Sequence, residues 1–214
     1  MYTLFARPGW GSAIVELQLA WYALPYTVED VENPFTSAAA RARLAPLNPI
    51  TQLPTLLLPD GQVMTESAAI TLHLADLAPA RSLVPPPNHP ARPAFLRWLV
   101  FTVANIYPTF TYADDPARFV ADPAAQPAFK ASVDAYAKRL WSMMEDAADT
   151  PPTTGPWFTG SDLTALDLTI AVMTNWRPNR PWFAEHCPKL HSIALAAEAL
   201  PELRATWLRN VVQP

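Results

Sequence analysis

The sequence has little cysteine, glycine or charge. Its single cysteine, Cys187, excludes an intramolecular disulfide framework and a cysteine-rich metal site. Only 5 of its 214 residues are glycine, and it contains neither G-x-G-x-x-G nor G-x-x-x-x-G-K-[ST], so the common nucleotide-binding loops are absent. Charged residues make up 16% of the chain, and the 15 lysines and arginines form no cluster. With a formal net charge of −4, we expect no nucleic-acid partner.

Signals for membranes and metals are also lacking. The N-terminus has no basic segment of a secretory signal. The most apolar stretch, residues 94–106, is short and contains Arg97, so we expect no membrane span and a cytoplasmic protein. The four histidines do not pair on one helical face, so we expect no bound metal.

Apolar residues and proline are abundant. Half of the chain is apolar and 11% is aromatic, which is enough for a hydrophobic core in one large or two small domains. The 25 prolines are scattered, and their only run is 85–87, so the chain is not of low complexity.

Residues 1–78 alternate between strand and helix patterns in the order β-α-β-(α)-β-β-α, which predicts a compact α/β domain. The predicted strands are 2–5, 26–31, 52–58 and 63–64. The last two form a hairpin around a turn at 59–61. The predicted helices are 12–24, 36–44 and one that begins at residue 66.

Residues 79–90 are rich in proline and poor in apolar anchors, so we expect a linker there. Residues 91–214 have helical periodicity throughout and predict an all-helical second domain. Pro108 should kink its first helix. The expected helices are 94–112, 129–148, 163–176, 188–199 and 201–210.

Four local motifs carry a family resemblance. They are the loop Pro8-Gly9-Trp10-Gly11-Ser12 before a helix that ends in Leu24-Pro25-Tyr26, the string N-P-I-T-Q-L-P-T-L at 48–56, E-S-A-A-I at 66–70, and Phe158-Thr159-Gly160 followed by T-A-L-D at 164–167. In this order and spacing they resemble the cytosolic glutathione transferase superfamily over essentially the whole chain, with a bacterial-type, serine-like active-site loop.

The resemblance implies a thioredoxin-like, glutathione-binding domain at 1–78 and an all-α domain at 91–214. It implies a homodimeric transferase, with a role in detoxification, that directs the thiol of glutathione, its co-substrate, at a small hydrophobic electrophile. Two alternatives stay open: a protein that binds glutathione or a hydrophobic ligand without catalysis, and a glutathione-dependent peroxidase or isomerase on the same fold.

The resemblance assigns glutathione-binding roles to five residues of the first domain. A cis Pro54 would turn the Leu53 backbone outward to pair with the cysteinyl part of the peptide, although Pro54 could be a plain strand-entry proline. Glu66 and Ser67 at a helix start suit the ammonium and carboxylate of a γ-glutamyl group, although Ser67 could simply cap the helix. Gln52 could reach the glycyl end.

The thiol needs a group that stabilises its thiolate at neutral pH. The tyrosine of the tyrosine classes would fall near residues 6–7, where this chain has none, and residues 1–78 contain no cysteine. Ser12 is therefore the candidate catalytic donor, with an N-cap role as the alternative. The family position that carries cysteine in bacterial relatives aligns with Gly11, and Arg7 and Trp10 flank the same loop.

In the second domain the acceptor pocket is expected between the domains, on the first helix. Aromatic residues at helical spacing could equally be core residues. The T-A-L-D segment predicts a structural capping box in which Asp167 bonds back to Thr164. Trp176 and Trp182 could close the pocket or simply pack. The candidate pocket residues are Phe101, Asn105, Tyr107, Pro108, Phe110 and Tyr112.

Overall fold

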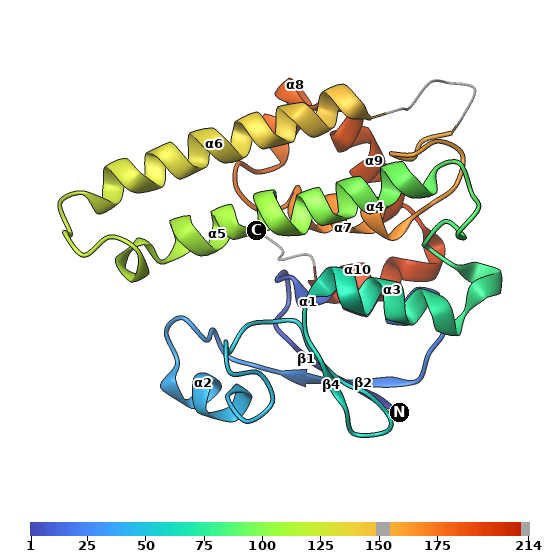
Figure 1. The fold of residues 1–214 in the computed structure, drawn as a ribbon, viewed down its shortest axis with the longest axis horizontal. Coiled ribbons are helices and arrows are strands. Elements are labelled where there is room, and N and C mark those ends of the chain that lie inside the picture. The colour runs from blue at the N-terminus through green and yellow to red at the C-terminus, as the bar shows by residue number, and fades with distance from the viewer. Residues whose placement is uncertain (149–154, 211–214) are drawn as a thin grey trace. The chain divides into compact units, whose positions relative to one another are not determined.

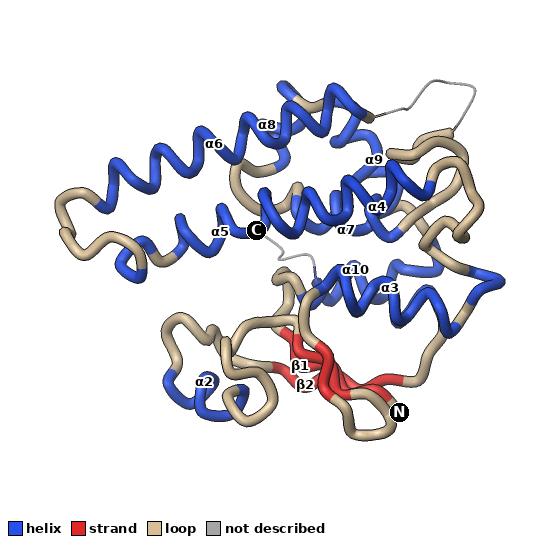
Figure 2. The backbone as a smooth tube through the Cα atoms, viewed as in Figure 1, coloured by secondary structure: helices blue, strands red, loops and turns tan. Residues whose placement is uncertain are grey.

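A computed structural model of the chain describes residues 1–148 and 155–210 (Figure 1). The chain forms two compact units. The first contains Met1–Pro86 together with the C-terminal segment from Ala196, and the second is Pro87–Leu195. All four strands belong to the first unit, and the second unit is built from helices and loops (Figure 2).

The first unit follows the predicted order of elements, which confirms the α/β assignment. Its strands are β1 (Tyr2–Ala6), β2 (Tyr26–Asp30), β3 (Thr55–Leu57) and β4 (Val63–Met64), and its helices are α1 (Ser12–Trp21), α2 (Ala38–Leu44), α3 (Ser67–Leu77) and the C-terminal α10 (Arg204–Asn210). The strand predicted at 52–58 is shorter because Pro54 has no N–H to donate to a ladder.

The sheet has the order β2-β1-β3-β4. β1 runs parallel to β2 and antiparallel to β3, and β3 pairs with β4 as the predicted hairpin. Alternate residues of β1 are buried, as expected of a strand covered on one face by α1. On the other side Phe5 packs against a buried cluster that includes Val31, Leu44 and Leu53.

The second unit is all-helical. One predicted helix, 94–112, is wrong as a single element. The chain instead forms α4 (Arg92–Phe101), a π-helical segment (Thr102–Ile106) and α5 (Tyr107–Asp114). Pro108 has no N–H for an i→i−4 bond, and the winding widens directly before it. The remaining helices are α6 (Gln126–Ala147), α7 (Ala165–Met173), α8 (Arg180–His186) and α9 (Pro188–Glu198), whose last residues belong to the first unit.

The predicted helix 201–210 begins as a short 3-10 turn, Pro201–Leu203, and continues as α10. Among the described residues, no helix is long and apolar enough to cross a membrane.

Candidate functional site: one end of the sheet in the first unit

The register of the sheet brings three predicted segments to one end. Phe5 pairs with Thr55, so the chain that leaves β1 at Ala6 lies level with Pro54. Leu56 pairs with Met64, so the chain that leaves β4 toward Glu66 ends on the same side. The loop at 7–11, the Leu53–Pro54 bond and the start of α3 therefore meet at one edge, although they are far apart in sequence.

The loop before α1 is held by its own backbone and by Ser12. The Ser12 side chain is fully buried. Its Oγ accepts from the Arg7 N–H at 3.0 Å and donates to the Arg7 carbonyl at 3.1 Å. The Trp10 N–H donates to the same carbonyl at 3.1 Å. Gly11, not Ser12, is the N-cap residue of α1, so the N-cap role considered for Ser12 is wrong.

Arg7 and Trp10 lie together in this loop. The Arg7 guanidinium lies 5.5 Å from the centroid of the Trp10 ring, a cation–π arrangement. Arg7 forms no ion pair with any residue in the described ranges. Trp10 packs against the buried cluster that contains Leu53 and lies 5.5 Å from the Phe35 ring. The loop is thereby seated beside the Leu53–Pro54 bond.

The Leu53–Pro54 peptide bond is cis, as the resemblance predicts. The carbonyl of the preceding residue, Gln52, is already hydrogen-bonded. It accepts from Asn48 Nδ2 at 3.0 Å and from Thr55 Oγ1 at 2.9 Å. The main-chain N–H and C=O of Leu53 bond to no residue that the structure describes, although the residue is buried. Buried main-chain groups are nearly always paired, so an unpaired N–H and C=O on one residue suit an extended peptide.

The start of α3 is shaped by an unusual backbone at Glu66. Glu66 is the N-cap residue and has φ +64°, a conformation that non-glycine residues rarely adopt and that is concentrated at functional sites. Ser67 is the first helical residue, and α3 has no side-chain capping bond, so the capping role considered for Ser67 is wrong. The Ser67 hydroxyl and the dipole of an 11-residue helix are thus available to an anion.

A polar cluster that the sequence did not predict joins α1 to α10, next to the loop at 7–11. Glu16 on α1 is 2% exposed, and burial raises the pKa of its carboxyl. Its Oε2 accepts from Arg209 Nη1 at 2.7 Å and from Asn210 Nδ2 at 2.9 Å, both on α10. Glu16 lies in the buried stripe of α1, and that position of a carboxylate was the only signal in the sequence.

In the second unit, the predicted acceptor residues do not form one cluster. Tyr107, Phe110 and Trp176 form a group of edge-to-face rings with centroids 5.0–6.4 Å apart. Asn105 bonds to the Phe101 carbonyl at 3.2 Å, and Tyr112 is exposed and packs on Phe119. Pro108 is half-buried beside Tyr107. Their role as an acceptor pocket stays a prediction.

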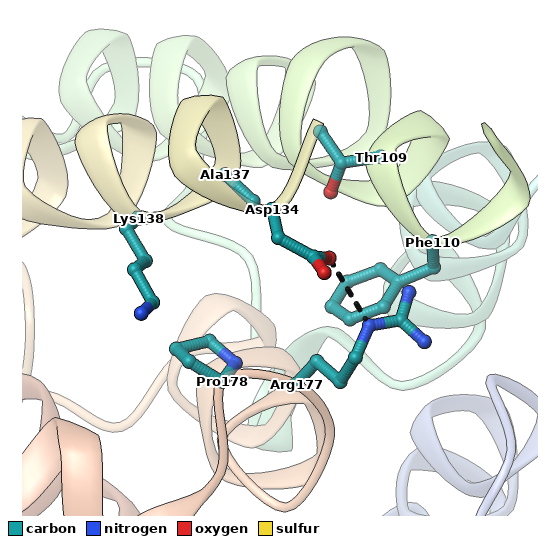
Figure 3. A pocket seen from close by; sticks show the side chains of 7 residues that line it. All are labelled: Thr109, Phe110, Asp134, Ala137, Lys138, Arg177 and Pro178. Atoms are coloured by element: carbon teal, nitrogen blue, oxygen red, sulfur yellow. Dashed lines mark hydrogen bonds and ion pairs between the residues drawn. The ribbon is translucent and has the colours of Figure 1, made fainter. Parts of the chain in front are cut away.

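A cavity of about 220 Å³ opens within the second unit between α5, α6 and the chain after α7 (Figure 3). Arg177 Nε bonds to Asp134 Oδ1 at 3.3 Å across it, and the same guanidinium pairs with Asp114. Of the predicted acceptor residues, Phe110 lines this cavity, and Phe101, Asn105, Tyr107, Pro108 and Tyr112 are not among its lining residues. The lining residues are Thr109, Phe110, Asp134, Ala137, Lys138, Arg177 and Pro178.

Two predicted structural roles in the second unit are confirmed. Asp167 is fully buried and accepts at 2.7 Å from the Thr164 N–H, the Thr164 hydroxyl and the Phe158 N–H. Burial raises the pKa of the Asp167 carboxyl to about 6. Cys187 is fully buried, and burial raises the pKa of its thiol to about 12, as suits an inert packing residue.

Comparisons with known proteins agree on one family. The family model described as "Glutathione S-transferase, N-terminal domain" matches residues 12–77. The chain is 38% identical over 212 residues to an uncharacterised GST-like protein of Escherichia coli K12, YncG, covering 99% of this chain and all of that one. It is 27% identical over 176 residues, 81% of each chain, to glutathione S-transferase GstA of Escherichia coli O157:H7. A glutathione transferase homologue from Sulfitobacter, solved with bound glutathione, superposes with a TM-score of 0.84 at 22% identity over 99% of both chains.

Proposed function

Because the chain belongs to the glutathione S-transferase superfamily, we propose that it binds glutathione at the edge of the first unit and activates its thiol for attack on a hydrophobic electrophile. The observation that carries the proposal is the unpaired main-chain N–H and C=O of Leu53 before a cis proline. In this proposal residues 1–78 form the glutathione-binding domain and 91–214 the helical domain, joined by 79–90.

The cysteinyl part of glutathione would lie antiparallel to Leu53. One N–H and one C=O of the ligand would pair with the two free groups of this residue, as a strand adds to a sheet edge. Pro54 keeps those groups directed away from the ladder of β3, and Gln52 would contact the glycyl end. Recognition by main-chain bonds needs the backbone of Leu53 and tolerates changes in its side chain.

The γ-glutamyl end would lie at the start of α3. Its carboxylate would accept from the Ser67 hydroxyl and the first N–H groups of the helix, where the helix dipole favours an anion. The exposed Glu66 carboxylate would pair with the ammonium group. Glu66 and Ser67 are adjacent at this helix start, where the backbone of Glu66 has a φ of +64°.

The thiolate would lie near the loop at 7–11. A free thiol with a pKa of about 8.5 is mostly protonated at neutral pH, and nearby positive charge lowers that pKa. The Arg7 guanidinium and the N-terminus of α1 supply positive potential there, and the Gly11 and Ser12 N–H groups donate to no residue in the described part of the chain. A catalytic role for the Ser12 hydroxyl stays a prediction, since its proton is directed at the Arg7 carbonyl.

The electrophile would bind against the aromatic residues of the second unit. We propose Phe101, Asn105, Tyr107, Pro108 and Tyr112 as its contacts, because apolar rings suit a hydrophobic acceptor. As for the family generally, we propose a cytoplasmic homodimer with a role in detoxification. Proximity and electrostatic stabilisation of the thiolate would supply most of the rate.

The test is calorimetric titration with glutathione, followed by turnover of an activated aryl halide. We expect binding by the wild-type chain and about tenfold weaker binding by Ser67→Ala, the loss of roughly one hydrogen bond to a charged group. Ser132→Ala, at an exposed serine of α6 in the second unit, is the matched control. If the wild type does not bind glutathione, the whole proposal is wrong. Binding without turnover would leave a glutathione-binding protein and remove the enzymatic part.

A further inference from the structure

The C-terminal helix α10 belongs to the first unit and lies beside α1 (Figure 1). Its last described residues, Arg209 and Asn210, are separated from α1 by more than 190 residues in sequence. They nonetheless bond to Glu16 on α1, and Asn210 also bonds to Gly9 in the loop at 7–11.

The contact is built on the buried carboxylate of Glu16. A buried carboxylate is costly unless it is paired and hydrogen-bonded. Arg209 supplies the charge at 2.7 Å and also pairs with Asp30, which lies at the end of β2. Asn210 supplies a neutral donor at 2.9 Å. The phenol of Tyr26 is the other titratable group that faces Glu16.

The amide of Asn210 is bonded on both sides. Its Nδ2 donates to Glu16 Oε2 and to the Thr206 carbonyl at 3.0 Å, which fix the orientation of the amide plane. Its Oδ1 therefore points away from Glu16 and accepts from the N–H of Gly9 at 3.4 Å. Gly9 has φ +75°, a conformation that needs glycine, and it lies in the middle of the loop.

We propose that Asn210 is a positioning residue for the glutathione thiol. Its amide donates to the buried Glu16 carboxylate and accepts from the N–H of Gly9, and this second bond fixes the loop between Arg7 and the start of α1. This inference rests on the proposed function and deepens it. Ser12 accepts a hydrogen bond from Arg7 at one end of the loop, and Asn210, from α10, accepts one from Gly9 at its centre. Both anchors act on the backbone that carries the Arg7 charge.

Loss of the Asn210 amide should loosen the loop without removing any group that touches glutathione. Arg7 and the N–H groups of α1 would then spend less time near the sulfur. The thiol of bound glutathione would become a weaker acid, and activity would be recovered at a pH high enough to form the thiolate without assistance. A residue that merely supports folding would lower stability and leave the acidity of the bound thiol unchanged.

The experiment follows the ultraviolet absorbance of the thiolate in the glutathione complex across pH, for the wild type, Asn210→Ala and Thr206→Val. Thr206 is buried one turn earlier on α10 and does not contact the loop, so its variant controls for destabilisation of the helix. We expect the thiol pKa to rise by about half a unit or more in Asn210→Ala and to stay at the wild-type value in Thr206→Val.

Asn210→Gln provides a second variant should Asn210→Ala not fold, because it keeps the amide and displaces it by one methylene. The same upward shift is expected from it. An unchanged thiol pKa in the folded Asn210 variants, with glutathione binding intact in the wild type, would overturn the inference alone. If the wild type itself does not bind glutathione, the proposed function fails, and this inference fails with it.

Discussion

The hydroxyl of Ser12 is bonded in both directions to a single residue, Arg7, accepting from its N–H and donating to its carbonyl. The side chain is fully buried, so these bonds form away from competing water. Ser12 thus closes the turn that leads from β1 into α1. The arrangement favours a role for Ser12 in shaping the loop.

Ser12→Ala should lower the free energy of unfolding by about 1–3 kcal/mol, because it removes the acceptor of the Arg7 N–H and one of the two donors to the Arg7 carbonyl. Activity should fall mainly through a higher KM for glutathione. Chemical denaturation and steady-state kinetics measure the two effects. A large fall in kcat at unchanged stability would instead assign the Ser12 hydroxyl directly to the thiol.

Arg7→Gln should raise the pKa of the bound thiol by about one unit, which lowers kcat/KM at neutral pH about tenfold. The loss should shrink as the pH rises past the thiol pKa. Arg81→Gln is the matched control, because Arg81 also stacks on a tryptophan, Trp21, at 4.9 Å and lies outside the site. Equal pH–rate profiles for Arg7→Gln and the control would refute a role for the Arg7 charge.

Asp167→Ala should produce a folding defect and no specific catalytic defect. The substitution leaves the N–H groups of Phe158 and Thr164 without their acceptor in the core of the helical unit. We expect a loss of about 2–3 kcal/mol in unfolding free energy. Thermal denaturation measures it, and the prediction is contradicted by lost turnover at an unchanged melting temperature.

The stability of the wild-type protein should also depend on the ionisation of Asp167. Burial raises the pKa of its carboxyl from an ordinary 3.8 to about 6, so the folded state holds this proton more tightly than the unfolded state. The resulting stability is present at low pH and is lost as the pH rises from about 4 to about 6. Chemical denaturation across this pH range should show a free energy of unfolding that falls with rising pH in the wild type through this group, and no such fall in Asp167→Asn. Parallel curves would argue against the raised pKa.

Cys187 should resist alkylation in the folded protein. With a thiol pKa of about 12 and a fully buried side chain, its thiolate is scarce and inaccessible. Iodoacetamide at pH 8 should therefore modify the native protein about a thousandfold more slowly than the unfolded chain. Mass spectrometry of both samples tests this, and similar rates in the two states would show that the site opens readily.

Much of the first unit is predictable from local pattern. The order of strands and helices and the hairpin depend on residues close together in sequence, and periodicity and turn chemistry report on such residues. The same holds for the capping interaction between Asp167 and Thr164 in the second unit. The boundaries and the interrupted helix at 92–114 were less predictable. Where Pro108 changes the winding depends on packing around the π-helical segment, and the largely apolar sequence pattern does not mark that position.

The Glu16 cluster could not be predicted from the sequence. Glu16 is separated from Arg209 by 193 residues, and no periodicity relates positions that far apart. Likewise, the sequence singles out Ser12 as a polar residue at a helix start but does not indicate where its proton points. That depends on how the loop folds back on Arg7.

By itself the sequence determined the class of the protein: an α/β unit followed by helices, with the motifs of a glutathione-binding family. Those features follow from backbone propensities and from short segments whose side chains act locally. Only the tertiary structure decided that the main-chain groups of Leu53 find no hydrogen-bond partner and Arg7 no ion pair among the described residues, and that Asn210 accepts from the N–H of Gly9. These three features depend on which distant segments pack together and exclude water. In such buried places an unpaired polar group costs free energy, and a single hydrogen bond is stronger than in water.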